Sequence, residues 1–260
     1  MVPELAGTVT SVAAVNTNLR DAFVKLADCS HAGTVERFGS ITATATRAPT
    51  PLFNRAFALD FPVHEDLTDA VAWLAQREVP FWVTVTADDV RAVTALDLES
   101  PLEPIAGRQP GMVLSSLDDI PVADGSVEIK QVTNVEKFEE WVAVAASAFG
   151  MADEILYHLD PACLLADDDI RFFTGWLDGH PVATGQLIKT GPVAGVYNIG
   201  VLDDTRRHGF GEALTWHVLR TGRDLGCQTG VLQSSEMAYP LYTKMGFEPV
   251  VQYRNLEPVT

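Results

Sequence analysis

The sequence predicts a layered α/β (α+β) protein in which helices flank a mixed central sheet. Segments with helical periodicity alternate along the whole chain with segments rich in β-branched and aromatic residues. Hydrophobic residues make up 47% of the 260 residues, which is enough for a substantial core. No apolar run approaches the roughly 20 residues that a membrane helix needs. We therefore expect a soluble globular protein with one large or two ordinary domains.

The first half of the chain alternates between the two kinds of element. Helices are expected at residues 18–29, 65–77 and 87–96, and strands at 35–46, 53–61 and 80–86. Pro49 and Pro51 separate the first two strands. Alternation of this kind predicts helices packed on a sheet.

Two stretches rich in turn-forming and polar residues, 101–111 and 115–126, separate the halves. We place the boundary in the second stretch, between a domain of residues 1–120 and one of residues 125–260. The second half then shows a strand at 127–132, a helix at 137–149 with Asn134 as its N-cap, and a helix at 152–165 that Pro161 interrupts. There follow a hairpin of 170–176 and 180–190 around Asp178-Gly179, strands at 195–202 and 230–233, a short helix around Tyr242 and a closing strand at 249–254.

Residues 201–226 are the stretch around which the second half is organised. They read as a strand end, a glycine-bearing turn and an amphipathic helix that Gly226 ends. The turn, residues 206–211, has the spacing Arg-x-x-Gly-x-Gly. Its glycines allow positive φ angles and close approach of a ligand, and the helix start presents free N–H groups. This arrangement suits a pyrophosphate, although a glycine pair before a helix also occurs as a simple tight turn.

A second motif follows the strand at 230–233. A serine, a short helix and the pattern Tyr-x-x-x-Gly-Phe at 242–247 come in that order. Together, the two motifs resemble the GNAT superfamily of acyl-CoA-dependent N-acetyltransferases. The resemblance covers about the last half of the chain, whose element order matches a complete domain of that superfamily with its mixed central sheet.

The resemblance implies a set of site residues. The turn would cradle the pyrophosphate of acetyl-CoA, the backbone of the preceding strand would pair with the pantetheine arm, and Tyr242 would lie near the thioester sulfur. Ser235 stands where many members carry asparagine, and it would cap the short helix unless Pro240 is the first helical residue. The implied cofactor-binding residues are Ile199, Val201, Arg206, Arg207, His208, Gly209, Phe210, Gly211, Ser235 and Tyr242.

The first half also resembles the leading half of two-domain members of this superfamily, but it lacks the Arg-x-x-Gly-x-Gly pattern. We therefore expect one CoA site, with residues 1–120 forming a degenerate copy or a lid. An unrelated α/β domain is the alternative.

The charge balance is strongly acidic. There are 35 acidic and 18 basic residues and a formal charge of −17, which disfavours nucleic acid as a partner. This balance is typical of proteins with an acidic proteome from a salt-loving (halophile) cytoplasm, although an ordinary acidic bacterial protein would also fit.

The three cysteines, Cys29, Cys163 and Cys227, are far apart and odd in number. We expect neither a disulfide framework nor a metal site from them, and Cys29 and His31 are expected to be structural. The N-terminus lacks the pattern of a secretion signal, so we expect a cytoplasmic protein without membrane partners.

The expected reaction is direct transfer of an acetyl group from acetyl-CoA to the amine of a small molecule or a protein. The expected catalytic residue is Tyr242, as a hydrogen-bond donor to the departing sulfur, although it could also be a core tyrosine. The sequence offers no clear general base; Asp203, Asp204, Tyr197 and Asn198 are weak candidates. A catalytically silent CoA sensor or scaffold and a nucleotide-binding protein are the alternatives. A homodimer, the acceptor and the acyl length stay open.

Overall fold

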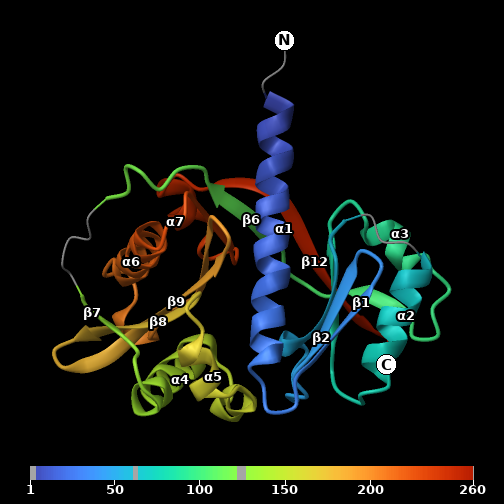
Figure 1. The fold of residues 1–260 in the computed structure, drawn as a ribbon, viewed down its shortest axis with the longest axis horizontal. Helices are drawn as coiled ribbons and strands as arrows, with labels where there is room; N and C mark the ends of the chain where they lie inside the picture. Colours follow the sequence, from blue (N-terminus) through green and yellow to red (C-terminus); the bar gives the residue numbers. More distant parts are fainter. Residues whose placement is uncertain (1–3, 61–63, 122–126, 260) are drawn as a thin grey trace.

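The computed structural model describes residues 4–60, 64–121 and 127–259 (Figure 1). In the first half the elements are α1 (Glu4–Asp28), β1 (Thr34–Phe38), β2 (Ile41–Ala45), β3 (Asn54–Ala58), α2 (His64–Ala75), β4 (Trp82–Thr86), α3 (Val90–Thr94), β5 (Leu102–Pro104) and β6 (Gln109–Leu114). In the second half they are β7 (Glu128–Gln131), α4 (Val135–Phe149), α5 (Pro161–Ala166), β8 (Ile170–Leu177), β9 (His180–Thr190), β10 (Val193–Val201), α6 (Phe210–Asp224), β11 (Thr229–Gln233), α7 (Tyr239–Lys244) and β12 (Glu248–Pro258). The mixed α/β architecture with a sheet flanked by helices is confirmed.

One sheet runs through both halves in the order β1-β2-β3-β4-β12-β6-β11-β10-β9-β8-β7, and β5 pairs with β12. Strands cross the expected boundary in both directions. β6 precedes the boundary but lies between β11 and β12, while β12, at the end of the chain, pairs with β4 of the first half. The two halves therefore share strands.

Helices cover both faces of the sheet in the second half. α6 and α7 pack on one face around Leu214, Val218 and Phe247, and α4 packs on the other face around Trp141 and Phe172. The long helix α1 stands between the halves and lies on the same face as α4 (Figure 1). No helix among the described residues combines the length and apolarity required for a bilayer span.

Helix α1 is longer than the sequence indicated, since it begins at Glu4 rather than near residue 18. Its side chains hold two strands of the second half, β9 and β12. Asn18 Nδ2 donates to the carbonyl oxygen of Ile188 in β9 at 3.0 Å, and the Tyr253 hydroxyl of β12 donates to Asn16 Oδ1.

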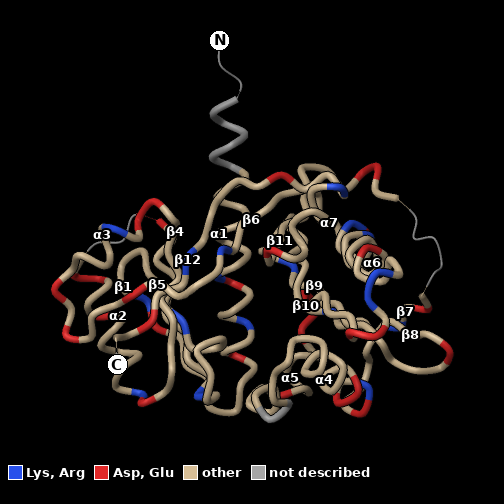
Figure 2. Tube along the Cα trace, turned by 180° about the vertical axis from the view of Figure 1, so that it is seen from behind, with Lys and Arg blue, Asp and Glu red and all other residues tan. Residues whose placement is uncertain are grey.

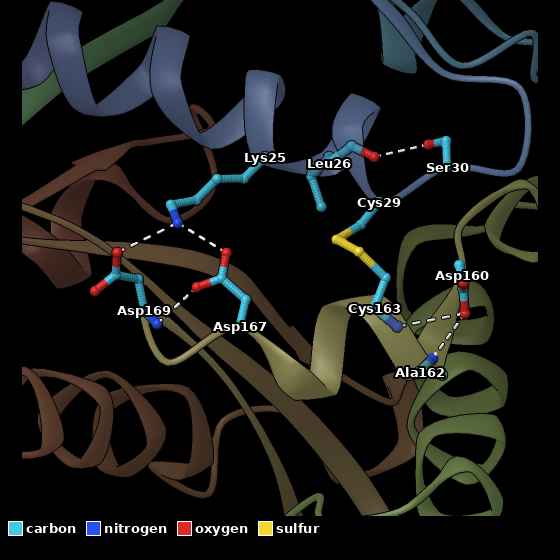
Figure 3. Close-up of a disulfide and its surroundings, with 9 residues drawn as sticks. All are labelled: Lys25, Leu26, Cys29, Ser30, Asp160, Ala162, Cys163, Asp167 and Asp169. Atoms are coloured by element: carbon cyan, nitrogen blue, oxygen red, sulfur yellow. Dashed lines mark hydrogen bonds and ion pairs between the residues drawn. A yellow bond between two sulfur atoms is a disulfide. The ribbon is translucent and has the colours of Figure 1, made fainter.

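The expectation that the cysteines form no disulfide is wrong. Cys29, just after α1, is bonded to Cys163 of α5, with their Cα atoms 5.4 Å apart (Figure 3). The same junction contains a hydrogen bond from the Asp160 N–H to the Cys29 carbonyl at 2.7 Å, and Lys25 Nζ lies 2.8 Å from Asp167 Oδ2. Because 134 residues separate the two cysteines, local spacing in the sequence does not indicate that they pair.

Two other local expectations differ from the structure. The segment 35–46 is two strands, because Gly39 takes a φ of 53° and turns the chain back on itself. The segment 101–111 contains β5 and the start of β6 rather than only turns. Pro110 lies within β6, opposite Gln252 of β12.

Candidate functional site

The central feature of the site is a gap between β10 and β11. These strands pair in parallel only from Val193 to Gly195, with Val231 as the last partner, although β10 continues to Val201 and β11 to Gln233. Unpaired backbone of both strands therefore faces the gap beyond that point, which is what an extended ligand arm requires.

A bulge in β10 lies beside this gap. The ladder with β9 pairs Tyr197 with Gln186 and then Gly200 with Thr184, so it skips Asn198 and Ile199. Asn198 has a φ of 50°, a left-handed conformation that asparagine tolerates better than most residues. Bulges re-aim side chains and backbone groups, and they are frequent next to active sites.

The turn at 206–211 leads directly into α6, as the sequence predicted. Gly209 is the N-cap residue with a φ of 82°, Arg207 has a φ of 66°, and α6 starts at Phe210. The first N–H groups of α6 have no intrahelical partners and point toward the turn. A Cβ added to Gly209 would meet nothing within 4 Å, so the space above the helix start is open.

The start of α6 packs against the gap and against α7. A Cβ on Gly211 would lie 3.7 Å from Ile199 and 3.8 Å from Leu241 of α7. The structure thus brings together the turn, β10 and the Tyr242 helix, the three elements that the sequence motifs indicate.

The Arg206 side chain is not a free cation at the turn, because it has partners within the protein. Its Nε donates to the Val201 carbonyl at 3.1 Å, its Nη2 donates to the Ala148 carbonyl of α4 at 3.1 Å, and it pairs with Asp203 at 2.7 Å. The side chain therefore ties the turn to β10 and α4, and Asp203 acts as its partner. Arg207 and His208 are exposed at the turn, as is Gly209.

Helix α7 begins at Tyr239, so Pro240 is the second helical residue. The Ser235 hydroxyl accepts the Ala238 N–H at 3.2 Å, which stabilises the turn before the helix. Tyr242 is 7% exposed and packs against Phe247. Burial raises the pKa of Tyr242 to about 12, while a hydrogen bond with Thr215 lowers it in part, so the phenol stays protonated at neutral pH.

A cleft of about 650 Å³ adjoins the turn. Gly209, Glu212 and Trp216 of α6 form one wall, and Lys244 of α7 forms another. The segment 116–121, which the sequence marked only as a linker, closes the third side. Lys244 Nζ lies 3.0 Å from Glu212 Oε2, which places a cation at the rim.

The residues present fit coenzyme A. An open helix start with left-handed residues before it suits a diphosphate, the gap suits the pantetheine arm, and the adjoining cleft offers apolar and charged walls. No group of three or more candidate metal ligands occurs in the part of the chain that the structure describes.

Comparisons with known proteins agree with this geometry. The family model of the acetyltransferase (GNAT) family matches residues 135–247. None of the curated proteins compared matches the sequence.

Solved structures share the fold at low sequence identity. A GCN5-related N-acetyltransferase from Kribbella flavida superposes with a TM-score of 0.67 at 17% identity, covering 93% of this chain and 95% of that one. A GCN5-related N-acetyltransferase from Sphaerobacter thermophilus gives 0.57 at 17% identity, covering 84% and 76%. A tandem GNAT protein of the clavulanic acid biosynthesis pathway gives 0.57 at 14% identity, covering 88% and 83%. Residues 135–247 thus form an N-acetyltransferase domain of the GNAT family.

Proposed function

We propose that the protein transfers an acetyl group from acetyl-CoA to the amine of a small molecule or a protein. The observation that carries the proposal is the open helix start at Gly209, next to the part of β10 that borders the gap, in a domain of this family. The amides at residues 207–211 would hold the pyrophosphate, and the backbone of Ile199 and Val201 would bind the pantetheine arm. Ser235 would border that arm at the end of β11.

In the proposed reaction the lone pair of a neutral amine attacks the thioester carbonyl carbon. The C–S bond breaks, the sulfur leaves with the bonding electrons, and a proton lost from the nitrogen balances the charge, which gives an N-acetyl amide and CoA. A backbone N–H of the bulged strand, at Ile199 or Val201, is proposed to stabilise the developing oxyanion. The protonated Tyr242 phenol is proposed to donate a hydrogen bond to the leaving sulfur.

Release of free thiol from acetyl-CoA in the presence of an amine panel tests this function. We expect Tyr242→Phe to lower turnover by about a hundredfold with CoA affinity nearly unchanged, because it removes the hydroxyl that is proposed to donate to the sulfur and keeps the ring. Tyr239→Phe, on the same helix, is the matched control and should retain activity.

CoA binding without thiol release for any amine would favour the alternative, a silent CoA sensor or scaffold. Absence of CoA binding would refute both.

We also propose that the acidic surface is an adaptation to high salt. Acidic segments are spread over both halves of the molecule (Figure 2), and the formal charge is −17. Because the Debye length falls to about 3 Å at 1 M salt, the self-repulsion of this surface is screened there. We expect the unfolding temperature to rise steeply from dilute buffer to molar KCl, while an uncharged osmolyte at equal osmolality has a smaller effect. A flat response to KCl would identify an ordinary acidic protein.

Residues 1–120 are proposed to be a degenerate GNAT-like domain without a CoA site, and neither nucleic acid nor membrane is proposed as a partner. We propose the cytoplasm as the location. The Cys29–Cys163 disulfide is unusual for that reducing compartment.

A further inference from the structure

A second pocket lies between the two halves of the chain. This inter-half pocket has a volume of about 450 Å³ and shares no lining residue with the cleft beside the start of α6. Tyr253 and Asn255 of β12 and Gln109 of β6 form its floor, and the connection between β5 and β6 closes one side. Trp82 of β4 lies at one end, and residues 235–237, which follow β11, lie at the other. Both halves therefore contribute to this pocket.

The inter-half pocket adjoins the gap between β10 and β11. Ser235 follows β11 and lines the pocket, while the gap lies on the other side of that strand, because β11 pairs with β6 on one side and β10 on the other. Tyr253 in the pocket floor also lies near Tyr197 of β10: burial, and in addition the neighbouring Tyr253 phenol, raises the pKa of Tyr197 above its ordinary value. A molecule in the pocket would thus lie beside the thioester arm proposed to occupy the gap.

Much of the wall of the inter-half pocket is apolar. Trp82 is partly buried, Ile105 adds aliphatic surface, and Met237 is 76% exposed. The guanidinium of the buried Arg55 packs over the Trp82 ring, with Cζ 4.9 Å from the ring centre, and so fixes the ring from one side. The rest of the ring gives the pocket a rigid aromatic surface, against which a flat aromatic group packs well.

The charges of the pocket are few and balanced. Of the described residues that line it, only Glu236 carries a carboxylate and only Arg108 a guanidinium, and both are exposed. In a chain of charge −17, this balance gives a polycation little advantage in the pocket. Glu236 follows Ser235, so the carboxylate stands at the end next to the gap and opposite Trp82. An ammonium group is therefore attracted to the gap end, and an apolar body to the Trp82 end.

We propose that the inter-half pocket binds the acceptor, and that this acceptor is a small-molecule primary amine on a short linker from a flat aromatic body. The body packs against Trp82, and the amine points past Ser235 to the thioester. A concave pocket of this volume suits a small molecule. The first half of the chain thereby completes the acceptor site. This inference rests on the proposed acetyl transfer and narrows its substrate class.

The test measures thiol release from acetyl-CoA with 2-phenylethylamine, tryptamine, propylamine, spermidine and an alanine-initiated tripeptide. The amines are compared at equal concentrations of free amine, which removes the differences between their pKa values. We expect kcat/KM to be at least about tenfold higher for the two aromatic amines than for propylamine, because only they place a ring against Trp82. Spermidine represents a polycation, and the tripeptide represents a protein N-terminus.

Trp82→Phe keeps an aromatic ring at the end of the pocket but reduces its area. We expect the ratio of kcat/KM for 2-phenylethylamine to that for propylamine to fall about fivefold, mainly through KM. Trp73→Phe is the matched control, because Trp73 also packs under a guanidinium, that of Arg77 at 3.2 Å, and does not line the pocket. Its ratio should equal that of wild type. Thermal unfolding establishes that both variants fold.

Ala106→Trp fills the pocket without removing any packing. Ala106 is exposed and lines the pocket in the connection between β5 and β6, so the new indole would occupy the space of the acceptor. We expect KM for 2-phenylethylamine to rise about tenfold or more, with the calorimetric affinity for CoA unchanged. Ala95→Trp, at an exposed alanine that follows α3, is the matched control and should leave both values unchanged.

The inference is overturned if propylamine, spermidine or the tripeptide is the best acceptor, or if Trp82→Phe and Ala106→Trp both behave as their controls do. The proposed acetyl transfer would stand in either case. If CoA binds and no amine in the panel releases thiol, the inference is overturned as well. Failure of the wild-type protein to bind CoA would instead refute the proposed function itself, and the inference with it.

Discussion

Replacing Gly209 by valine will weaken CoA binding by about ten- to a hundredfold. Valine disfavours the φ of 82° that Gly209 adopts, and its side chain would project into the space where the diphosphate is expected. Hydrogen bonds to a charged group are worth about 1.5–3 kcal/mol each, so displacing the ligand from one or two amides accounts for the loss. Isothermal titration calorimetry with CoA measures it.

Gly179→Val is a closely matched control. Gly179 lies in the turn between β8 and β9 with a φ of 80°, and a Cβ there also meets nothing within 4 Å. Both variants should therefore lose similar stability through backbone strain, of about 1–3 kcal/mol. Only the variant at Gly209 should lose affinity. Equal CoA affinity of Gly209→Val and wild type would remove the helix start from the cofactor site.

Exchange of Cys29 and Cys163 for serine will destabilise the protein by about 4 kcal/mol. The disulfide closes a loop across a separation of 134 residues, and in the chain-entropy model a loop of this size restricts the unfolded chain strongly. For a protein of this size the loss corresponds to a fall in melting temperature of about 10 °C. Thermal unfolding of wild type and the double variant measures the difference.

A reducing agent provides the internal control for this prediction. The free cysteine, Cys227, is buried, and burial raises the pKa of its thiol, so it contributes little to thiol exchange. Dithiothreitol should lower the melting temperature of wild type toward that of the double variant and leave the variant itself unchanged. If wild type melts at the same temperature with and without the reductant, the disulfide does not form in solution.

The sequence was informative wherever the determining interaction is local. Asn134 caps α4 by accepting the Lys137 N–H at 2.9 Å, and Pro161 starts α5 instead of lying inside a longer helix. Asp178 and Gly179 both take positive φ in the predicted hairpin, and Gly226 follows α6 with a φ of 89°. The turn at Gly209 and the position of α6 were likewise indicated by local residues, the glycines of the turn and the periodic apolar residues after it.

Features that depend on distant partners could not be read from local patterns. β6 was interpreted as part of a turn-rich segment, because its strand character comes from pairing with β11 and β12 on either side. The partner of Cys29 and the inter-half pocket are also products of the tertiary structure. The binding role of each site residue stays a prediction until CoA binding is measured.

The position of β12 has a consequence for how the protein forms during synthesis. β12 pairs with β4 on one side and β6 on the other, and it follows both of them in the sequence. Until it has left the ribosome, the edges of β4 and β6 that face β12 have no partner, although β4 also pairs with β3 and β6 with β11. Exposed edges invite pairing with other chains. A chain that ends before residue 248 would lack β12, so β4 and β6 would each lose a neighbouring strand at the same time. Neither half could then complete its part of the sheet from its own residues alone.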